Sequence, residues 1–97
     1  MDVVFKLQND EFEWDTEKYA VNLRKHGVKF EIAAEVFFDP FYKTGDASTA
    51  KEKRDYIIGY SFSEKLFLVV FVERDKRTRI ISARAATPTE RKFYEES

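Results

Sequence analysis

The stretch that decides the fold runs from Arg54 to Ala86 and contains three apolar segments, Tyr56-Ile57-Ile58-Gly59-Tyr60, Leu66-Phe67-Leu68-Val69-Val70-Phe71-Val72 and Thr78-Arg79-Ile80-Ile81-Ser82-Ala83. β-Branched and aromatic residues predominate in all three, as is typical of strands. The middle segment is apolar at every position, which indicates a strand covered on both faces, whereas its neighbours alternate with charged residues. We therefore predict a three-stranded meander with residues 66–72 at the centre of the sheet.

A helix is predicted directly after this meander. In Thr87-Pro88-Thr89-Glu90, the threonine is placed to cap the third amide and the glutamate closes a capping box. Proline occupies the first helical position, where its missing N–H costs nothing. A short helix therefore runs to the C-terminus.

The residues before the meander predict a strand and a pair of helices. Phe12-Glu13-Trp14 alternates like an edge strand, which we expect to continue backward through Val3, Val4 and Phe5. Asp15 is placed to cap a helix from Thr16 to about Lys25, and Gly27 to end it. A second helix, from about 30 to 38, stops before Asp39-Pro40 because the residue ahead of proline avoids helical geometry. The two helices form the predicted hairpin.

The remaining segment, 41–53, is rich in small and charged residues, and we predict a short strand followed by a mobile loop there. The fold class is therefore α+β, with an antiparallel sheet, an N-terminal helix hairpin and a short C-terminal helix. Ninety-seven residues suffice for one core, so we expect a single domain over residues 1–97.

Composition excludes several classes of protein. Hydrophobic residues make up 43% of the chain, with ten Phe and five Tyr, which is too apolar for a disordered segment. The chain has no cysteine, so disulfides, thiolate nucleophiles and cysteine-bound zinc are excluded. It shows no secretory signal and no apolar run of about 20 residues, the length that a membrane helix needs. These features fit a cytoplasmic protein.

Charge is unevenly distributed along the chain. The formal net charge is −1, but residues 1–50 hold six Lys/Arg against ten Asp/Glu, whereas residues 51–97 hold eleven against eight. The first half is thus net −4 and the second net +3. We expect an anion to bind the basic half, whose charge the acidic helices of the first half mask in the total.

Basic side chains cluster around the turn after the central strand. Residues 74–84 contain one acid and five cations: Arg74, Lys76, Arg77, Arg79 and Arg84. Arg54 joins them from the first strand of the meander. RNA cleavage without a metal ion needs a base for the 2′-hydroxyl proton, an acid for the leaving oxygen and fixed positive charge at the phosphorane. Guanidinium groups suit the last task. The alternative is a solvated hairpin whose charges prevent aggregation.

Strand alternation sets a condition on this site. Arg79 and Arg84 are five residues apart, so in a regular strand they point to opposite faces. They can share a site only if a bulge or a strand end intervenes.

Other side chains are candidates for proton transfer or RNA contact. His26 is the only histidine, although a histidine in a last helical turn often merely caps the helix. Glu73 is a candidate base that could equally pair with an arginine. Tyr60 and Tyr94 could donate protons, stack on bases or simply pack, and Arg91 shares a helix face with Tyr94. Because no metal-ligand spacing, phosphate loop or Ser-His-Asp order is present, we expect neither metal nor cofactor.

Together, several motifs resemble those of a known family. The matching segments are Phe12-Glu13-Trp14-Asp15, Asn22-Leu23-Arg24-Lys25-His26-Gly27-Val28, Phe30-Glu31, Ala34-Glu35-Val36-Phe37, Arg54 with Gly59, Arg79-Ile80-Ile81-Ser82-Ala83-Arg84-Ala85-Ala86-Thr87, and Glu90-Arg91. Over about residues 11–96 the chain resembles BrnT-type toxins of bacterial type II toxin–antitoxin systems.

The resemblance implies a RelE-like fold and a ribonuclease activity that halts translation. It also implies neutralisation by a BrnA-type antitoxin, which binds operator DNA in the complex. By position, Arg54, Arg79 and Arg84 match the family's characteristic arginines, and His26 matches its Lys-His-Gly turn. We thus take these four residues and Glu73 as catalytic candidates, and five others as RNA-binding candidates: Arg74, Lys76, Arg77, Arg91 and Tyr94.

The chain departs from the family pattern at three places. Residues 1–10 precede the usual start, Lys53 and Asp55 flank Arg54 where an acid and an aromatic are more common, and Ala85 replaces a common lysine. A different hypothesis is a non-catalytic module in which the helix pair around Gly27 contacts DNA like a helix-turn-helix. A gel shift of the isolated chain on its own promoter separates the two hypotheses.

Overall fold

The computed structural model describes residues 1–96, and its strands form one mixed sheet of six in the order β1-β2-β6-β5-β4-β3. The strands are β1 (Asp2–Leu7), β2 (Asp10–Asp15), β3 (Lys43–Asp46), β4 (Asp55–Tyr60), β5 (Leu66–Arg74) and β6 (Arg77–Ala85). The helices are α1 (Thr16–His26), α2 (Phe30–Ala33), the 3₁₀ helix η1 (Ala34–Phe38) and α3 (Pro88–Glu95). The α+β class predicted from the sequence is confirmed, but the prediction of an antiparallel sheet is wrong because β2 pairs in parallel with β6. None of these helices in residues 1–96 is long and apolar enough to cross a membrane.

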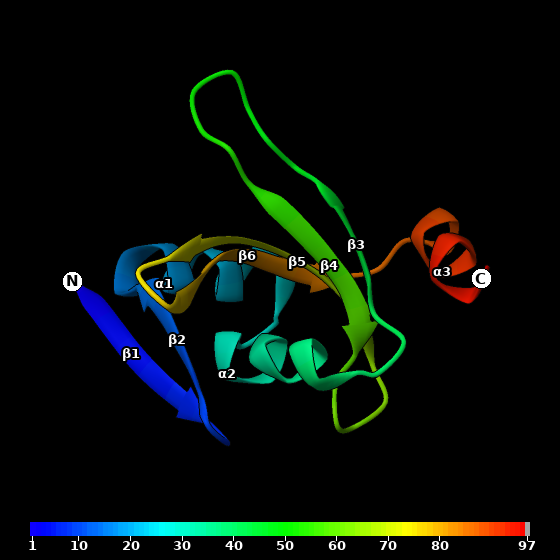
Figure 1. Cartoon of the computed structure of the whole chain (residues 1–97), viewed down its shortest axis with the longest axis horizontal. Coiled ribbons are helices and arrows are strands. Elements are labelled where there is room, and N and C mark those ends of the chain that lie inside the picture. Colours follow the sequence, from blue (N-terminus) through cyan, green and yellow to red (C-terminus); the bar gives the residue numbers. More distant parts are fainter. Residues whose placement is uncertain (97) are drawn as a thin grey trace.

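The predicted meander is present as β4, β5 and β6, with antiparallel pairing throughout. β5 lies between the other two, and residues 66–69 are all buried. The short strand expected after residue 41 is β3, which pairs with β4. The β3–β4 connection projects away from the rest of the molecule (Figure 1).

The N-terminal segment differs from the prediction. Instead of one edge strand, residues 2–15 form a hairpin of β1 and β2, with Gln8 in the left-handed region at the turn (φ 56°). β2 is interior, because it also pairs in parallel with β6 through Phe12 and Glu13, and β1 forms the edge. Turn-forming Gln8-Asn9 divides two alternating segments, and this allows the chain to reverse there.

The helices agree with the prediction only in part. α1 begins at the Asp15 cap, whose side chain accepts a hydrogen bond from the Lys18 amide, and ends at Gly27 with φ 70°. The predicted second helix is wrong beyond Ala33, where α2 gives way to the 3₁₀ helix η1. η1 lies so close to β4 that a Cβ on Gly59 would be 2.9 Å from the Val36 carbonyl oxygen. An N-terminal helix hairpin is not confirmed, since two strands precede α1 and α2 is a single turn.

The main core lies between one face of the sheet and the α2–η1 segment. Trp14 and Phe12 of β2 pack there with Phe30, and their rings make edge contacts such as Trp14–Phe30 at 5.7 Å between centroids. Phe30 and Ala33 are fully buried. A buried single turn cannot enter a DNA groove, so this arrangement does not favour the helix-turn-helix hypothesis.

α1 covers the part of the β6 edge that β2 leaves unpaired. Pairing of β2 with β6 is confined to Thr78 and Arg79 on the β6 side. Farther along, the buried Asn22 side chain bonds both backbone groups of Ala83: its amide nitrogen donates to the carbonyl at 2.8 Å, and its oxygen accepts from the N–H at 3.1 Å. Asn22 thus takes the place of a neighbouring strand and fixes α1 beside β6.

α3 packs over the second, smaller apolar cluster on the opposite face of the sheet, which contains Ile58, Leu66 and Leu68. The predicted capping box of Thr87 and Glu90 is present. Tyr94 of α3 donates a hydrogen bond to the buried Asp39 at 2.5 Å. Burial alone would raise the pKa of Asp39, but the bonds from Tyr94 and from the amides of Tyr60 and Phe41 lower it. Asp39 therefore accepts as a carboxylate and ties α3 to the end of β4.

Candidate nucleic-acid site on the sheet

A bulge in β6 brings Arg79 and Arg84 to the same face of the sheet. Ile80 pairs with Phe71 whereas Ser82 pairs with the preceding Val70, so β6 has one residue more than β5 at this point. Ile80 and Ala83 are consequently both buried in the main core. The two arginines flank this pair and lie on the opposite face, so the condition that strand alternation imposed is met.

A basic groove runs along this face between α1 and β6. It consists of two adjoining hollows of about 560 and 430 Å³, which share Lys18 and Ile81. We call it the basic groove. Its polar lining has five basic side chains, Lys18, Lys25, His26, Arg74 and Arg79, three acidic ones, Asp15, Glu17 and Glu52, and the neutral Asn22 and Ser82. Basic side chains outnumber acidic ones in this lining, which suits a polyanion such as a nucleic-acid backbone.

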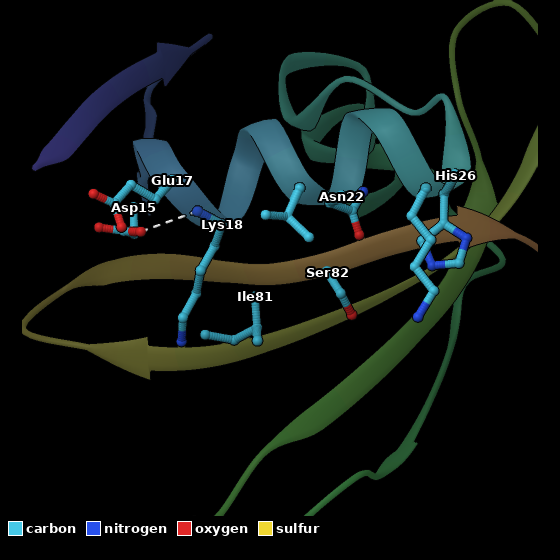
Figure 2. A pocket seen from close by; sticks show the side chains of 9 residues that line it. Asp15, Glu17, Lys18, Asn22, His26, Ile81 and Ser82 are labelled. Carbon is cyan, nitrogen blue, oxygen red and sulfur yellow. Dashed lines mark hydrogen bonds between the residues drawn. The ribbon is translucent and has the colours of Figure 1, made fainter.

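His26 lies at one end of the basic groove. In Figure 2 its ring stands beside the C-terminal half of β6, on the same side as Ser82, while Lys18 lies near Ile81 toward the other end. His26 is exposed, so it is open to a ligand in the groove.

Two arginines on this face, Arg79 and Arg77, have carboxylate partners. Arg79 binds Glu13 at 2.7 Å and Asp2 at 3.1 Å, and Arg77 binds Glu11 at 2.8 Å. The acids come from β1 and β2. The prediction that acidic helices mask the charge of the basic half is therefore wrong for these arginines, because strands supply their acidic partners.

Arg84 is held at the other end of β6. Its two terminal nitrogens donate to the two carboxylate oxygens of Glu90 at 2.7 and 2.8 Å, a bidentate pair. The backbones of Arg79 and Arg84 are roughly 15 Å apart at about 3.3 Å per residue. Since their partners draw the side chains toward opposite ends of the sheet, the two guanidinium groups suit different phosphates of one strand.

The Arg84–Glu90 pair predicts an acid-dependent loss of stability. The hydrogen bonds from Arg84 lower the pKa of Glu90 from 4.5 to about 2. A carboxyl with a lowered pKa stabilises the folded state above its unfolded pKa, and this contribution is lost as the pH falls from about 4.5 toward 2. In urea unfolding followed across this range, Glu90→Gln is expected to flatten the decline in unfolding free energy. An equally steep decline in the variant would contradict the assignment.

Arg54 and Arg74 extend the positive charge toward the β3–β4 connection. The Arg54 side chain bonds Glu52 at 2.5 Å, and Glu52 borders the same hollow as Arg74 and Arg79. Arg54, predicted to join the cluster from the first strand of the meander, is therefore close to the Arg79 end of the basic groove.

Glu73 and Lys76 lie elsewhere. They border a hollow beside Phe12 and Phe37, which belong to the helix-covered face. Glu73 accepts a hydrogen bond from the Thr78 hydroxyl at 3.1 Å. The structure thus does not bring Glu73 together with Arg79 and Arg84.

Tyr94 and Arg91 of α3 contact β4. The Tyr94 ring packs edge-on against Tyr60 at 5.3 Å between centroids, and Arg91 donates to the Tyr60 hydroxyl at 3.0 Å. Burial, the bond to Asp39 and its charge raise the pKa of Tyr94, so this phenol stays protonated. Both residues therefore contribute to the packing of α3 on β4, in addition to the RNA contact predicted for them.

Lys18, Lys25 and Ser82 were missed by the sequence reasoning. Spacings of three and four residues place a set of polar side chains along one side of α1: Lys18, Asn22, Lys25 and His26. This pattern could have indicated the groove. The acids that bind Arg79 gave no such signal, because their proximity depends on the parallel pairing of β2 with β6.

A family model described as the ribonuclease toxin BrnT of type II toxin–antitoxin systems matches residues 14–90. The chain belongs to the BrnT family of ribonuclease toxins. The crystal structure of the BrnT toxin of Brucella abortus is similar to it, with a TM-score of 0.55 and 25% sequence identity, and the match covers 76% of this chain and 92% of that one. None of the curated proteins matches the chain. β1 and most of β2 lie outside the BrnT family match.

Proposed function

We propose that the chain is the toxin of a type II toxin–antitoxin system, cutting RNA without a metal ion and thereby stopping translation in the cytoplasm. Membership of the BrnT family supports a ribonuclease toxin. The finer features, namely a RelE-like arrangement, neutralisation by a BrnA-type antitoxin and operator binding only through that complex, extend the family resemblance to this chain.

The observation that carries the proposal is the β6 bulge, which puts Arg79 and Arg84 on the face that the basic groove follows. In metal-free cleavage the 2′-oxygen attacks the adjacent phosphorus, its proton passes to a base, and the departing 5′-oxygen receives a proton. Arg79 would stabilise the charge on the reacting phosphate, and Arg84 would bind another phosphate of the same strand. His26 is the proton-transfer candidate within the groove. Glu73, on the other face, is the weaker candidate base.

The surrounding cations supply binding rather than chemistry in this proposal. Arg74 borders the Arg79 end, where Arg54 pairs with the lining residue Glu52. Arg77 contacts Glu13, the partner of Arg79. Arg91 and Tyr94 lie beyond Arg84 on α3. Lys76 would contact RNA only at the edge of the sheet. An antitoxin that covers the groove would need acidic side chains to match its charge.

Cleavage of RNA by the purified chain in the presence of a chelator tests the proposal. Cutting is expected for the parent, and His26→Gln is expected to slow it about 10²-fold or more, as the loss of a general acid or base does. Arg24→Ala is a matched control for the arginine variants, because Arg24 lies on α1 but does not border the groove. Failure of the parent to cut any RNA, with no growth defect on expression, would falsify the proposal.

A further inference from the structure

The guanidinium of Arg79 has two carboxylate partners of different character. Glu13 is the inner one, at 2.7 Å, with only 12% of its side chain exposed. Asp2 is the outer one, with 54% of its side chain exposed, and its two oxygens accept from Nη1 and Nη2 of Arg79, both at 3.1 Å. The outer partner can therefore leave for solvent while the inner one keeps Arg79 in place.

The Asp2 carboxylate contacts the guanidinium of Arg79 in the arrangement that a bound phosphate would adopt. Two parallel N–H···O bonds from one guanidinium are the arrangement in which arginine binds either a carboxylate or a phosphate. Arg79 borders the basic groove, which a nucleic-acid backbone would follow. A phosphate that reaches Arg79 from this groove meets the donors that Asp2 occupies.

β1, which carries Asp2, is held by its backbone pairing and by side chains other than that of Asp2. β1 pairs with β2 along its length, and Phe5 packs on Trp14 at 5.6 Å between ring centroids. Phe5 and Leu7 both contact the main core, whereas Asp2 is the first residue of the strand and is exposed. Withdrawal of the Asp2 side chain thus requires no loss of core packing. Exposed ion pairs of this kind contribute little to stability.

We propose that Asp2 competes with an RNA phosphate for Arg79, so that β1 weakens RNA binding by this chain. The proposal rests on the proposed function and specifies how its site is regulated. β1 lies outside the residues matched by the BrnT family, so the competition is a feature of this chain rather than of the matched region. Asp2 is ionised at neutral pH, since its hydrogen bonds with Arg79 lower its pKa.

Binding of a fluorescent RNA oligonucleotide, made uncleavable by 2′-O-methyl groups, tests the competition. The full chain is compared with Asp2→Asn, which removes the charge and keeps the size of the side chain. Asp10→Asn is the matched control, because it changes the net charge equally at the opposite end of the β1–β2 hairpin. Asp2→Asn is expected to lower Kd roughly two- to fivefold relative to both the parent and Asp10→Asn.

The same substitution in an Arg79→Ala background is expected to change Kd no more than Asp10→Asn does, because the shared guanidinium is gone. An unchanged Kd for Asp2→Asn overturns the proposal, and so does a raised Kd, which would mean that Asp2 orients Arg79 for RNA. If the parent binds the oligonucleotide but cuts no RNA, the proposed function fails while the Kd comparison still decides the role of Asp2. Absence of binding by all variants overturns both.

Discussion

Replacing Arg79 with alanine is expected to slow RNA cleavage by about 10²-fold or more, the usual effect of removing one preorganised donor from a charged transition state. Arg79 is the arginine that both borders the basic groove and is held in position by an inner carboxylate, Glu13. Cleavage rates of a labelled RNA under single-turnover conditions measure the loss. The cleavage rate of Arg79→Lys is expected to lie between those of the parent and Arg79→Ala, because lysine keeps the charge but not the bidentate geometry.

Two measurements separate this effect from misfolding. Circular dichroism melting of Arg79→Ala shows whether the fold survives the loss of the partner of Asp2 and Glu13. Arg24→Ala removes one arginine without touching the groove and should cleave at the parental rate. A folded Arg79→Ala protein with parental activity would exclude Arg79 from the chemistry.

Replacing Asn22 with alanine is expected to lower the free energy of unfolding by about 2 to 4 kcal/mol, because two buried backbone groups of Ala83 lose their partner. This is a large effect for a polar residue in a helix. It arises because α1, at this point, replaces the strand that β6 lacks. Urea unfolding of parent and variant gives the difference in free energy.

Arg24→Ala is also the control for this measurement. Because Arg24 is exposed on the same helix, its substitution should change the free energy of unfolding by no more than about 0.5 kcal/mol. A loss below about 1 kcal/mol for Asn22→Ala would show that water satisfies Ala83 instead. RNA cleavage by the variant, where it stays folded, should also fall, because α1 carries His26 and one wall of the groove.

Features that depend on neighbours in the chain were predictable. The three strands of the meander, the caps of α1 and the capping box of Thr87 follow from local hydrogen bonding and alternation. The prediction of the second helix was wrong beyond Ala33 because of tertiary packing. Val36 packs closely on Gly59, and this contact accompanies the tighter 3₁₀ geometry. The N-terminal hairpin was missed because the alternation of residues 2–15 does not reveal where the chain reverses.

The candidate site was predictable as a list of residues but not as an arrangement. Strand alternation predicted that Arg79 and Arg84 could share a face only if a bulge or a strand end lay between them. Only the pairing of β6 with β5 shows that the bulge exists. The separation of Glu73 from the arginines likewise depends on the register of the strands.

By itself, the sequence determined the α+β class, the meander and the positive charge of its second half, because these depend on local pattern and composition. Only the tertiary structure decided which arginines face the groove and which carboxylates hold them. Asp2 meets Arg79 across 77 positions of the chain, by way of a hairpin and a parallel strand pair. Such contacts arise from register between distant strands, and register is a property of the assembled sheet.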